Sequence, residues 1–126
     1  MKETPIPQIE LVDEITVIQL GPGYENVSEQ LLGTLQPIVL KAVEGANPPF
    51  VVMDLSQTKF FGSSFIELLF LIWKQLKARD GNLALAGVTE YCLEVIEITH
   101  LDQLWPVCPT RQEALTKVRS TPGEHT

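Results

Sequence analysis

The sequence is poor in the residues and segments that metal sites, disulfides and membrane spans require. It contains two cysteines and two histidines in 126 residues, and Cys92 and Cys108 form neither a Cys-x-x-Cys pair nor a Cys/His ligand spacing. We therefore expect two free thiols in a reducing compartment and no metal site. The longest strongly apolar stretch, residues 65–73, is interrupted by Glu67 and is far shorter than the roughly 20 residues that cross a bilayer. We expect no membrane insertion.

Positive charge is also scarce. Nine Lys and Arg residues stand against 16 Asp and Glu residues, which gives a formal net charge of −7. Such a chain repels phosphate backbones and anionic lipid surfaces, so direct binding to nucleic acid is disfavoured. The first ten residues contain two prolines and lack the apolar core of an export signal. The sequence therefore predicts a cytoplasmic protein.

Signatures of catalysis are missing as well. No glycine-rich phosphate loop follows a strand pattern, and His100 and His125 have neither a partnered nucleophile nor a metal-ligand spacing. The acidic residues show no pairing typical of acid–base catalysis. We predict a protein that is not an enzyme, that needs no cofactor, and that neither hydrolyses ATP nor transfers its phosphate.

What remains is the composition of one folded domain. Hydrophobic residues make up 44% of the chain and charged residues 20%, which is ordinary usage for a globular protein. A chain of 126 residues has room for a single core. We expect a domain over residues 1–118 and a flexible C-terminal tail over residues 119–126.

The hydropathy pattern alternates between strands and helices. Apolar segments on either side of Asp13-Glu14 predict a β-hairpin. Continuous apolar runs predict a central strand at residues 50–53, a second at 83–86 and a last strand region at 101–107. Helices are predicted over residues 28–45, kinked or split at Pro37, and over 63–79, 89–98 and 110–118. This order predicts an α/β fold with a mixed sheet of four to five strands and about four helices.

Two segments match a known pattern. Residues 52–64, Val-Met-Asp-Leu-Ser-Gln-Thr-Lys-Phe-Phe-Gly-Ser-Ser, resemble the signature loop of the STAS domain family, which includes bacterial anti-sigma-factor antagonists. Residues 99–107, followed by Arg-Gln-Glu-Ala-Leu at 111–115, resemble the family's Thr-Gly-Leu-Asp, strand and Glu-Ala-Leu ending. The resemblance implies a single STAS-like domain that binds an anti-sigma factor with serine-kinase activity and thereby frees a sigma factor.

The resemblance also implies a site of regulation. Ser63 falls at the serine that the kinase partner phosphorylates in regulated family members, and Ser64 is the second choice. A phosphate at a helix N-terminus would be held by free backbone donors and by the positive end of the helix dipole. Gly62 and Phe65 replace the usual Asp before and Gly after the serines. From the residues alone, the two serines could equally serve only as helix caps, with Asp54 and Ser56 stabilising the loop.

The predicted partner-binding surface extends from this loop along the following helix. One stripe of that helix, which includes Phe65 and Ile72, has the spacing of a core-facing side. A second apolar face about 100° away is either covered by a neighbouring element or exposed to a partner. The predicted contact residues are Asp54, Ser56, Thr58, Lys59, Gly62, Ser63, Ser64, Ile66, Phe70 and Trp73.

Two other functions stay open at this point. A constitutive scaffold or transporter-accessory subunit, without phosphorylation, is favoured by Gly62. A sensor of a small ligand or nucleotide would use the loop over residues 54–64 as its pocket. The sequence does not fix the oligomeric state, and a homodimer is compatible with it.

Overall fold

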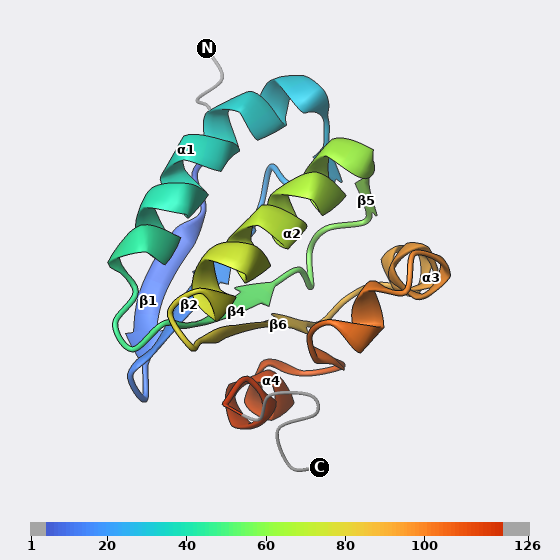
Figure 1. The fold of residues 1–126 in the computed structure, drawn as a ribbon. Coiled ribbons are helices and arrows are strands. Elements are labelled where there is room, and N and C mark those ends of the chain that lie inside the picture. The colour runs from blue at the N-terminus through green and yellow to red at the C-terminus, as the bar shows by residue number, and fades with distance from the viewer. Residues whose placement is uncertain (1–4, 120–126) are drawn as a thin grey trace.

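The computed structural model describes residues 5–119, and its centre is a mixed β-sheet (Figure 1). The strands lie in the order β1, β2, β4, β6, β7. Their bounds are β1 (Gln8–Val12), β2 (Ile15–Gln19), β4 (Phe50–Asp54), β6 (Asn82–Ala86) and β7 (Val107–Cys108). β1 is antiparallel to β2, and all other neighbours are parallel. The predicted α/β fold and the central position of residues 50–53 are confirmed.

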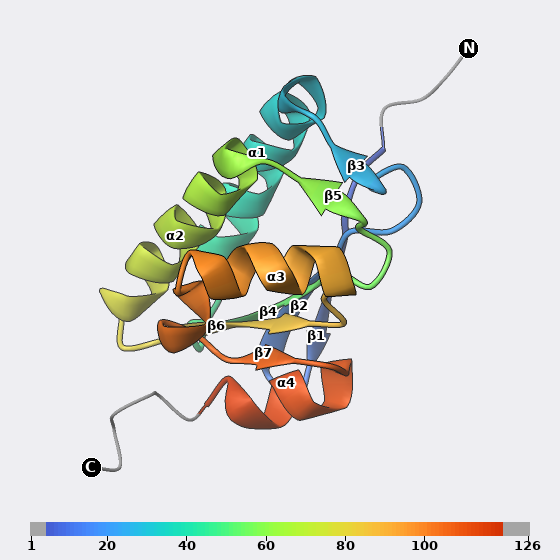
Figure 2. The ribbon, with the colours of Figure 1, turned by 90° about the vertical axis from the view of Figure 1, so that its right-hand side faces the viewer.

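Helices cover both faces of the sheet. They are α1 (Glu29–Gly45), α2 (Ser63–Lys77), α3 (Glu90–Ile98) and α4 (Arg111–Lys117). α1 and α2 lie side by side over one face, and α4 lies under the opposite face (Figure 2). The larger apolar core joins α1 and α2 to the sheet through residues such as Val39 and Ile72. A smaller one joins α4 to the other face through Val52, Ala84 and Ala114. None of the described helices is long and apolar enough to cross a bilayer.

Local signals fixed several element boundaries as predicted. Asp13 and Glu14 adopt positive φ angles of 51° and 67° and form the two-residue turn of the β1–β2 hairpin. Ser28 caps α1 by accepting a hydrogen bond from the Leu31 N–H, and Thr110 caps α4 by accepting one from the Glu113 N–H. These contacts lie within a few residues of each other in the chain. Sequence reasoning can therefore find them.

The predicted split at Pro37 is wrong, because α1 continues through it. Pro37 lacks an N–H and so deprives only the Gly33 carbonyl, four residues earlier, of its helical donor. Gly33 is exposed, so water can reach that carbonyl. Leu35 and Val39, on either side of the proline, are fully buried against the sheet. Tertiary packing thus holds both halves in one helix.

The prediction of a strand over residues 101–107 is also wrong. A short 3₁₀ turn, η1 (Leu101–Gln103), occupies its start, and the strand β7 begins only at Val107. Leu101 and Trp105, four residues apart, are both buried. That is the spacing of a helical turn, whereas a strand would place alternate residues on one face.

A second, two-stranded parallel sheet was not predicted. It pairs β3 (Asn26–Val27) with β5 (Phe60–Phe61). The N–H groups of Lys59 and Phe60 also donate to the Glu25 carbonyl, at 2.8 and 3.0 Å. Two-residue strands carry no readable periodicity. β5 ends at Phe61, directly before Gly62, the N-cap residue of α2. Of the predicted C-terminal tail, residues 120–126 lie outside the described part of the chain.

Candidate functional site

The loop over residues 55–62 connects the carboxyl end of β4 to the start of α2. Asp54 anchors its first part from a buried position. One carboxylate oxygen accepts a hydrogen bond from the Ser56 N–H at 3.0 Å, and the other accepts from Nε and Nη2 of Arg111 at 3.1 and 3.0 Å. Arg111 also contacts Glu10 Oε1 at 2.6 Å. Asp54 therefore ties the loop to α4 and to β1, and its side chain is not part of the exposed surface.

The electrostatics of this contact favour the charged pair. Burial alone would lower the pKa of Arg111, but its hydrogen bonds to Asp54 and Glu10 outweigh that effect and raise the pKa above its ordinary value. The guanidinium therefore stays charged at physiological pH.

The middle of the loop is held from the side of α3. Thr58 is fully buried, and its carbonyl accepts a hydrogen bond from Thr89 Oγ1 at 3.3 Å. The Cys92 thiol donates to the Lys59 carbonyl at 3.4 Å. Burial raises the pKa of Cys92, against a smaller opposite effect of its hydrogen bond with Thr89. Thr58 and Cys92 therefore support the loop from inside, whereas the side chains of Ser56 and Lys59 are exposed.

The serines do not cap α2. Gly62 occupies the N-cap position, with φ −106° and ψ −170°, and no side chain accepts from the first turn. Ser63 is the first helical residue and is exposed, and none of the described residues forms a hydrogen bond with its hydroxyl. Ser64 is partly buried, and its hydroxyl donates to Glu29 Oε1 at 3.0 Å. The capping interpretation is wrong for both residues, and the structure distinguishes a free hydroxyl from an engaged one.

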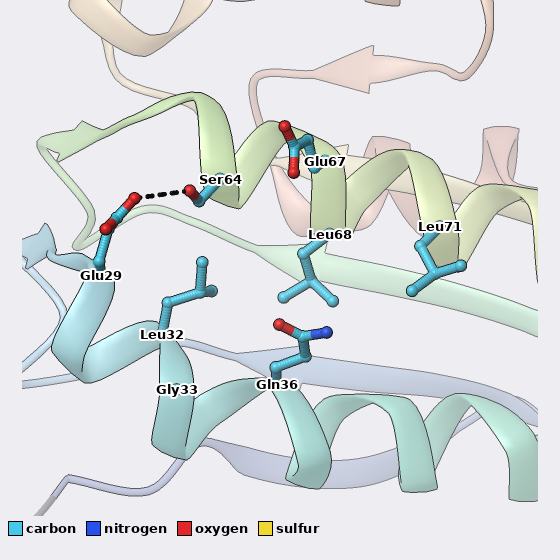
Figure 3. Close-up of a pocket in the computed structure, with 8 residues that line it drawn as sticks. All are labelled: Glu29, Leu32, Gly33, Gln36, Ser64, Glu67, Leu68 and Leu71. Atoms are coloured by element: carbon cyan, nitrogen blue, oxygen red, sulfur yellow. Dashed lines mark hydrogen bonds between the residues drawn. The ribbon is translucent and has the colours of Figure 1, made fainter.

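Ser64 lines a groove of about 380 Å³ between the first halves of α1 and α2. Figure 3 shows the Ser64–Glu29 hydrogen bond at one end, with Leu32 and Leu68 between the two helices. The complete lining is Glu29, Leu32, Gly33, Gln36, Ser64, Glu67, Leu68 and Leu71. Its lining mixes leucines with polar residues, and its two charged residues, Glu29 and Glu67, are both acidic. Of the predicted loop pocket over residues 54–64, only Ser64 contributes to it.

The second apolar face of α2 is divided between burial and exposure. Trp73 is half-buried, and its ring lies 6.2 Å from that of Trp105 and 5.6 Å from that of Phe70. Ile66 is half-buried too, but Phe70 remains 40% exposed. The two alternatives for this face are thus both realised: Trp105 covers one end, and Phe70 is accessible.

Sequence reasoning missed the residues that come from other elements. Glu29 and Glu67 border the groove, and Tyr91 of α3 packs its exposed ring edge to face at 5.2 Å against that of Phe60, near the end of the loop. Their spacing along the chain gives no signal, because β5 and α3 meet only in the folded protein. Among the predicted residues, Ser56, Lys59, Gly62, Ser63 and Phe70 are exposed, on the loop and on the first half of α2.

A model of the STAS domain family matches residues 9–114. The chain belongs to the STAS domain family. An anti-sigma-factor antagonist (STAS) domain protein from Planctomyces limnophilus is 38% identical in sequence, and the two structures superpose with a TM-score of 0.86 over 92% of this chain and all of that one. The resemblance seen in residues 52–64 is therefore confirmed at the level of family and fold.

Two further proteins are similar to this chain. The putative anti-sigma factor antagonist BtrV of Bordetella bronchiseptica is 31% identical over 64 residues, which is 51% of this chain and 55% of that protein. The aligned part of this STAS domain thus spans about half of BtrV. SpoIIAA, a cell fate determinant of Bacillus, was solved in its phosphorylated form; it is 22% identical, with a TM-score of 0.67 over 90% of this chain and 99% of that one. At that identity the likeness is one of fold.

Proposed function

We propose that this STAS domain is an anti-sigma-factor antagonist. It binds an anti-sigma factor through the exposed surface around the start of α2 and frees a sigma factor by competition. The P. limnophilus protein and BtrV, both named as antagonists, support this assignment. The domain acts by binding a partner and catalyses no reaction itself.

In this proposal, phosphorylation of Ser63 regulates binding to the partner. The observation that supports this part is the position of Ser63. Its hydroxyl is exposed at the first position of α2. The N–H groups of Ser63 and Ser64 lie in the first helical turn, where no carbonyl of the same helix can accept from them. A phosphate on Ser63 would meet these donors and the positive end of the helix dipole. Unphosphorylated Ser63 therefore already has the surroundings that a dianion needs.

Ser64 is the poorer acceptor of a phosphate. Its hydroxyl is engaged by Glu29 at 3.0 Å, and Glu67 lines the same groove. A phosphate on Ser64 would lie against two carboxylates, which repel it. The kinase substrate in our proposal is therefore Ser63.

Phosphorylation of Ser63 would act on the surface that carries Phe70. Residues seven apart lie on the same side of a helix, so Ser63 and Phe70 share one side of α2. A partner that covers Phe70 would then have to bury a group with a charge of about −1.5 to −2. An unpaired charge at a desolvated interface is strongly unfavourable, so binding should weaken.

Titration calorimetry against the serine-kinase-type anti-sigma factors of the source genome tests this proposal. Ser63→Asp should bind at least about tenfold more weakly than the wild type, which corresponds to about 1.4 kcal/mol. Ser63→Ala should bind like the wild type and take up no phosphate from the kinase. The matched control is Gln112→Glu, which adds a carboxylate to the exposed first turn of α4 on the opposite face. Equal binding by Ser63→Asp and the wild type would rule out the switch.

A second function is favoured by one residue. Gly62 stands where the family usually has an Asp before the serine, which favours a constitutive scaffold or transporter-accessory subunit without phosphorylation. The same titrations separate the two functions. A constitutive module should tolerate Ser63→Asp, but it should lose its partner in Phe70→Glu, because Phe70 is exposed on the same side of α2.

A further inference from the structure

Strand β1 lies at one edge of the sheet and pairs only with β2 among the described elements. Three large apolar side chains on or just before it are exposed: Ile6 at 70%, Ile9 at 45% and Leu11 at 68%. An unpaired edge with exposed apolar side chains is a template for another strand, and folded proteins usually protect such edges with lysine, proline or a bulge. Within Gln8–Val12 there is no lysine or proline, and the pairing with β2 contains no bulge. The one charged side chain of the strand, Glu10, is paired with Arg111 of the same chain.

The hairpin geometry determines which backbone groups of β1 face outward. The two-residue turn at Asp13-Glu14 is flanked by the pair Val12 and Ile15. In such a hairpin the flanking residues form a hydrogen-bonded pair, and the hydrogen-bonded pairs then recur at every second residue. Gln8, Glu10 and Val12 therefore bond to β2. The N–H and C=O groups of Ile9 and Leu11 point away from the sheet.

We propose that this edge pairs with β1 of a second copy of the chain, antiparallel about a two-fold axis at Glu10. In this register Ile9 of one copy lies opposite Leu11 of the other, and each such pair exchanges two backbone hydrogen bonds. The side chains of Ile9 and Leu11 point to the same face. The four apolar side chains from the two copies thus form one cluster, and cross-strand contacts of this kind stabilise a sheet.

The charges around the two-fold axis and the short length of the paired segment both favour weak, reversible dimerisation. The two Glu10 side chains would face each other on the opposite side of the sheet, where like charges are unfavourable. Each Glu10, however, already contacts its own Arg111 at 2.6 Å. Pro7 has no N–H to extend the pairing, so the contact is limited to the central residues. An interface this small is typical of weak association.

The dimer is independent of the proposed partner surface. Figure 1 shows β1 at the edge of the sheet away from β5 and the first turn of α2. A dimer through β1 would therefore leave Ser63 and Phe70 open, and the two proposals can fail separately.

Sedimentation velocity of the full chain from about 5 μM to about 1 mM, a range that detects weak association, tests the dimer. The wild type should shift from monomer towards dimer as its concentration rises. Leu11→Lys should lower the association constant at least tenfold, and it should fold normally because Leu11 is exposed. The matched control is Ile98→Lys, the same kind of change at a 75% exposed residue at the end of α3. It should dimerise like the wild type.

Hydrogen exchange gives a second measurement that depends on the register. In the wild type, the amide protons of Ile9 and Leu11 should exchange more slowly at high concentration, and those of Gln8 and Glu10 should not change. A wild type that stays monomeric at every concentration would overturn the proposal. So would a dimer that persists in Leu11→Lys, or one that is lost equally in Ile98→Lys.

Discussion

The N-cap of α2 allows a direct test of how this loop is built, through Gly62→Asp. Gly62 has φ −106°, a value that any residue adopts, and a Cβ built there has no atom within 4 Å. No side chain caps the helix in the native protein. An aspartate at this position can accept hydrogen bonds from the first-turn N–H groups without moving its surroundings.

Three contributions determine the size of the effect. Replacing glycine where the backbone is compatible stabilises by about 0.4–1 kcal/mol through the unfolded chain. At an N-cap, Asp stabilises a helix more than Gly does by about 0.3 kcal/mol. A carboxylate near the helix N-terminus contributes about 0.3–1 kcal/mol. Glu29, which contacts Ser64 at the same helix start, opposes part of this by repulsion. We expect a net gain of about 1 kcal/mol, or about 3–6 °C in Tm.

Urea denaturation of the variant and of Gly62→Ala measures this gain. Alanine restricts the unfolded chain in the same way, but it is a poorer N-cap residue than glycine. The two effects oppose each other, so the stability of Gly62→Ala should stay near that of the wild type. The difference between Asp and Ala isolates the cap and the dipole, and it should shrink in 1 M salt, where the Debye length is about 3 Å. If Asp is no more stable than Ala, the first turn of α2 is not the uncapped helix start described above.

Three other experiments test how the protein is held together around the site. Trp73→Glu should lower the free energy of unfolding by about 2–4 kcal/mol, because the ring packs against the buried Trp105; a wild-type urea midpoint would contradict this. In the same assay Arg111→Ala should lower the free energy of unfolding by about 2–3 kcal/mol, because it leaves the buried carboxylate of Asp54 unpaired. Arg111→Lys should have a stability between that of Arg111→Ala and that of the wild type. Burial raises the pKa of Cys92 and Cys108, so the unfolded chain ionises first and stability should fall as pH rises above about 8.5. Replacing both cysteines with alanine should flatten that pH dependence, whereas an unchanged slope would assign it to other groups.

Alternation of short apolar runs with amphipathic segments was enough to predict the α/β class and the central strand β4. The helix start at Thr110 and the hairpin turn at Asp13-Glu14 were predicted because their contacts join residues only a few positions apart. The signature loop at residues 52–64 gave the family, which the match over residues 9–114 confirmed. Information of this kind is local, or is carried by the order of residues in one segment.

Contacts between distant segments could not be predicted in the same way. Arg111 lies 57 residues from Asp54 in the chain. β3 pairs with β5 although α1 and β4 lie between them in the sequence. The first contact makes Asp54 a buried anchor, and the second ends directly before Gly62, the N-cap residue of α2.

The sequence by itself determined which segments become strands and helices and which family the chain belongs to, because backbone propensity and apolar periodicity act over a few residues. Only the tertiary structure decided which side chains of the loop are accessible. It buried Thr58 and Asp54, engaged Ser64 with Glu29 and left Ser63 and Phe70 exposed. The physical reason is that burial depends on which elements pack together, and that packing brings together residues whose separation along the chain has no fixed period.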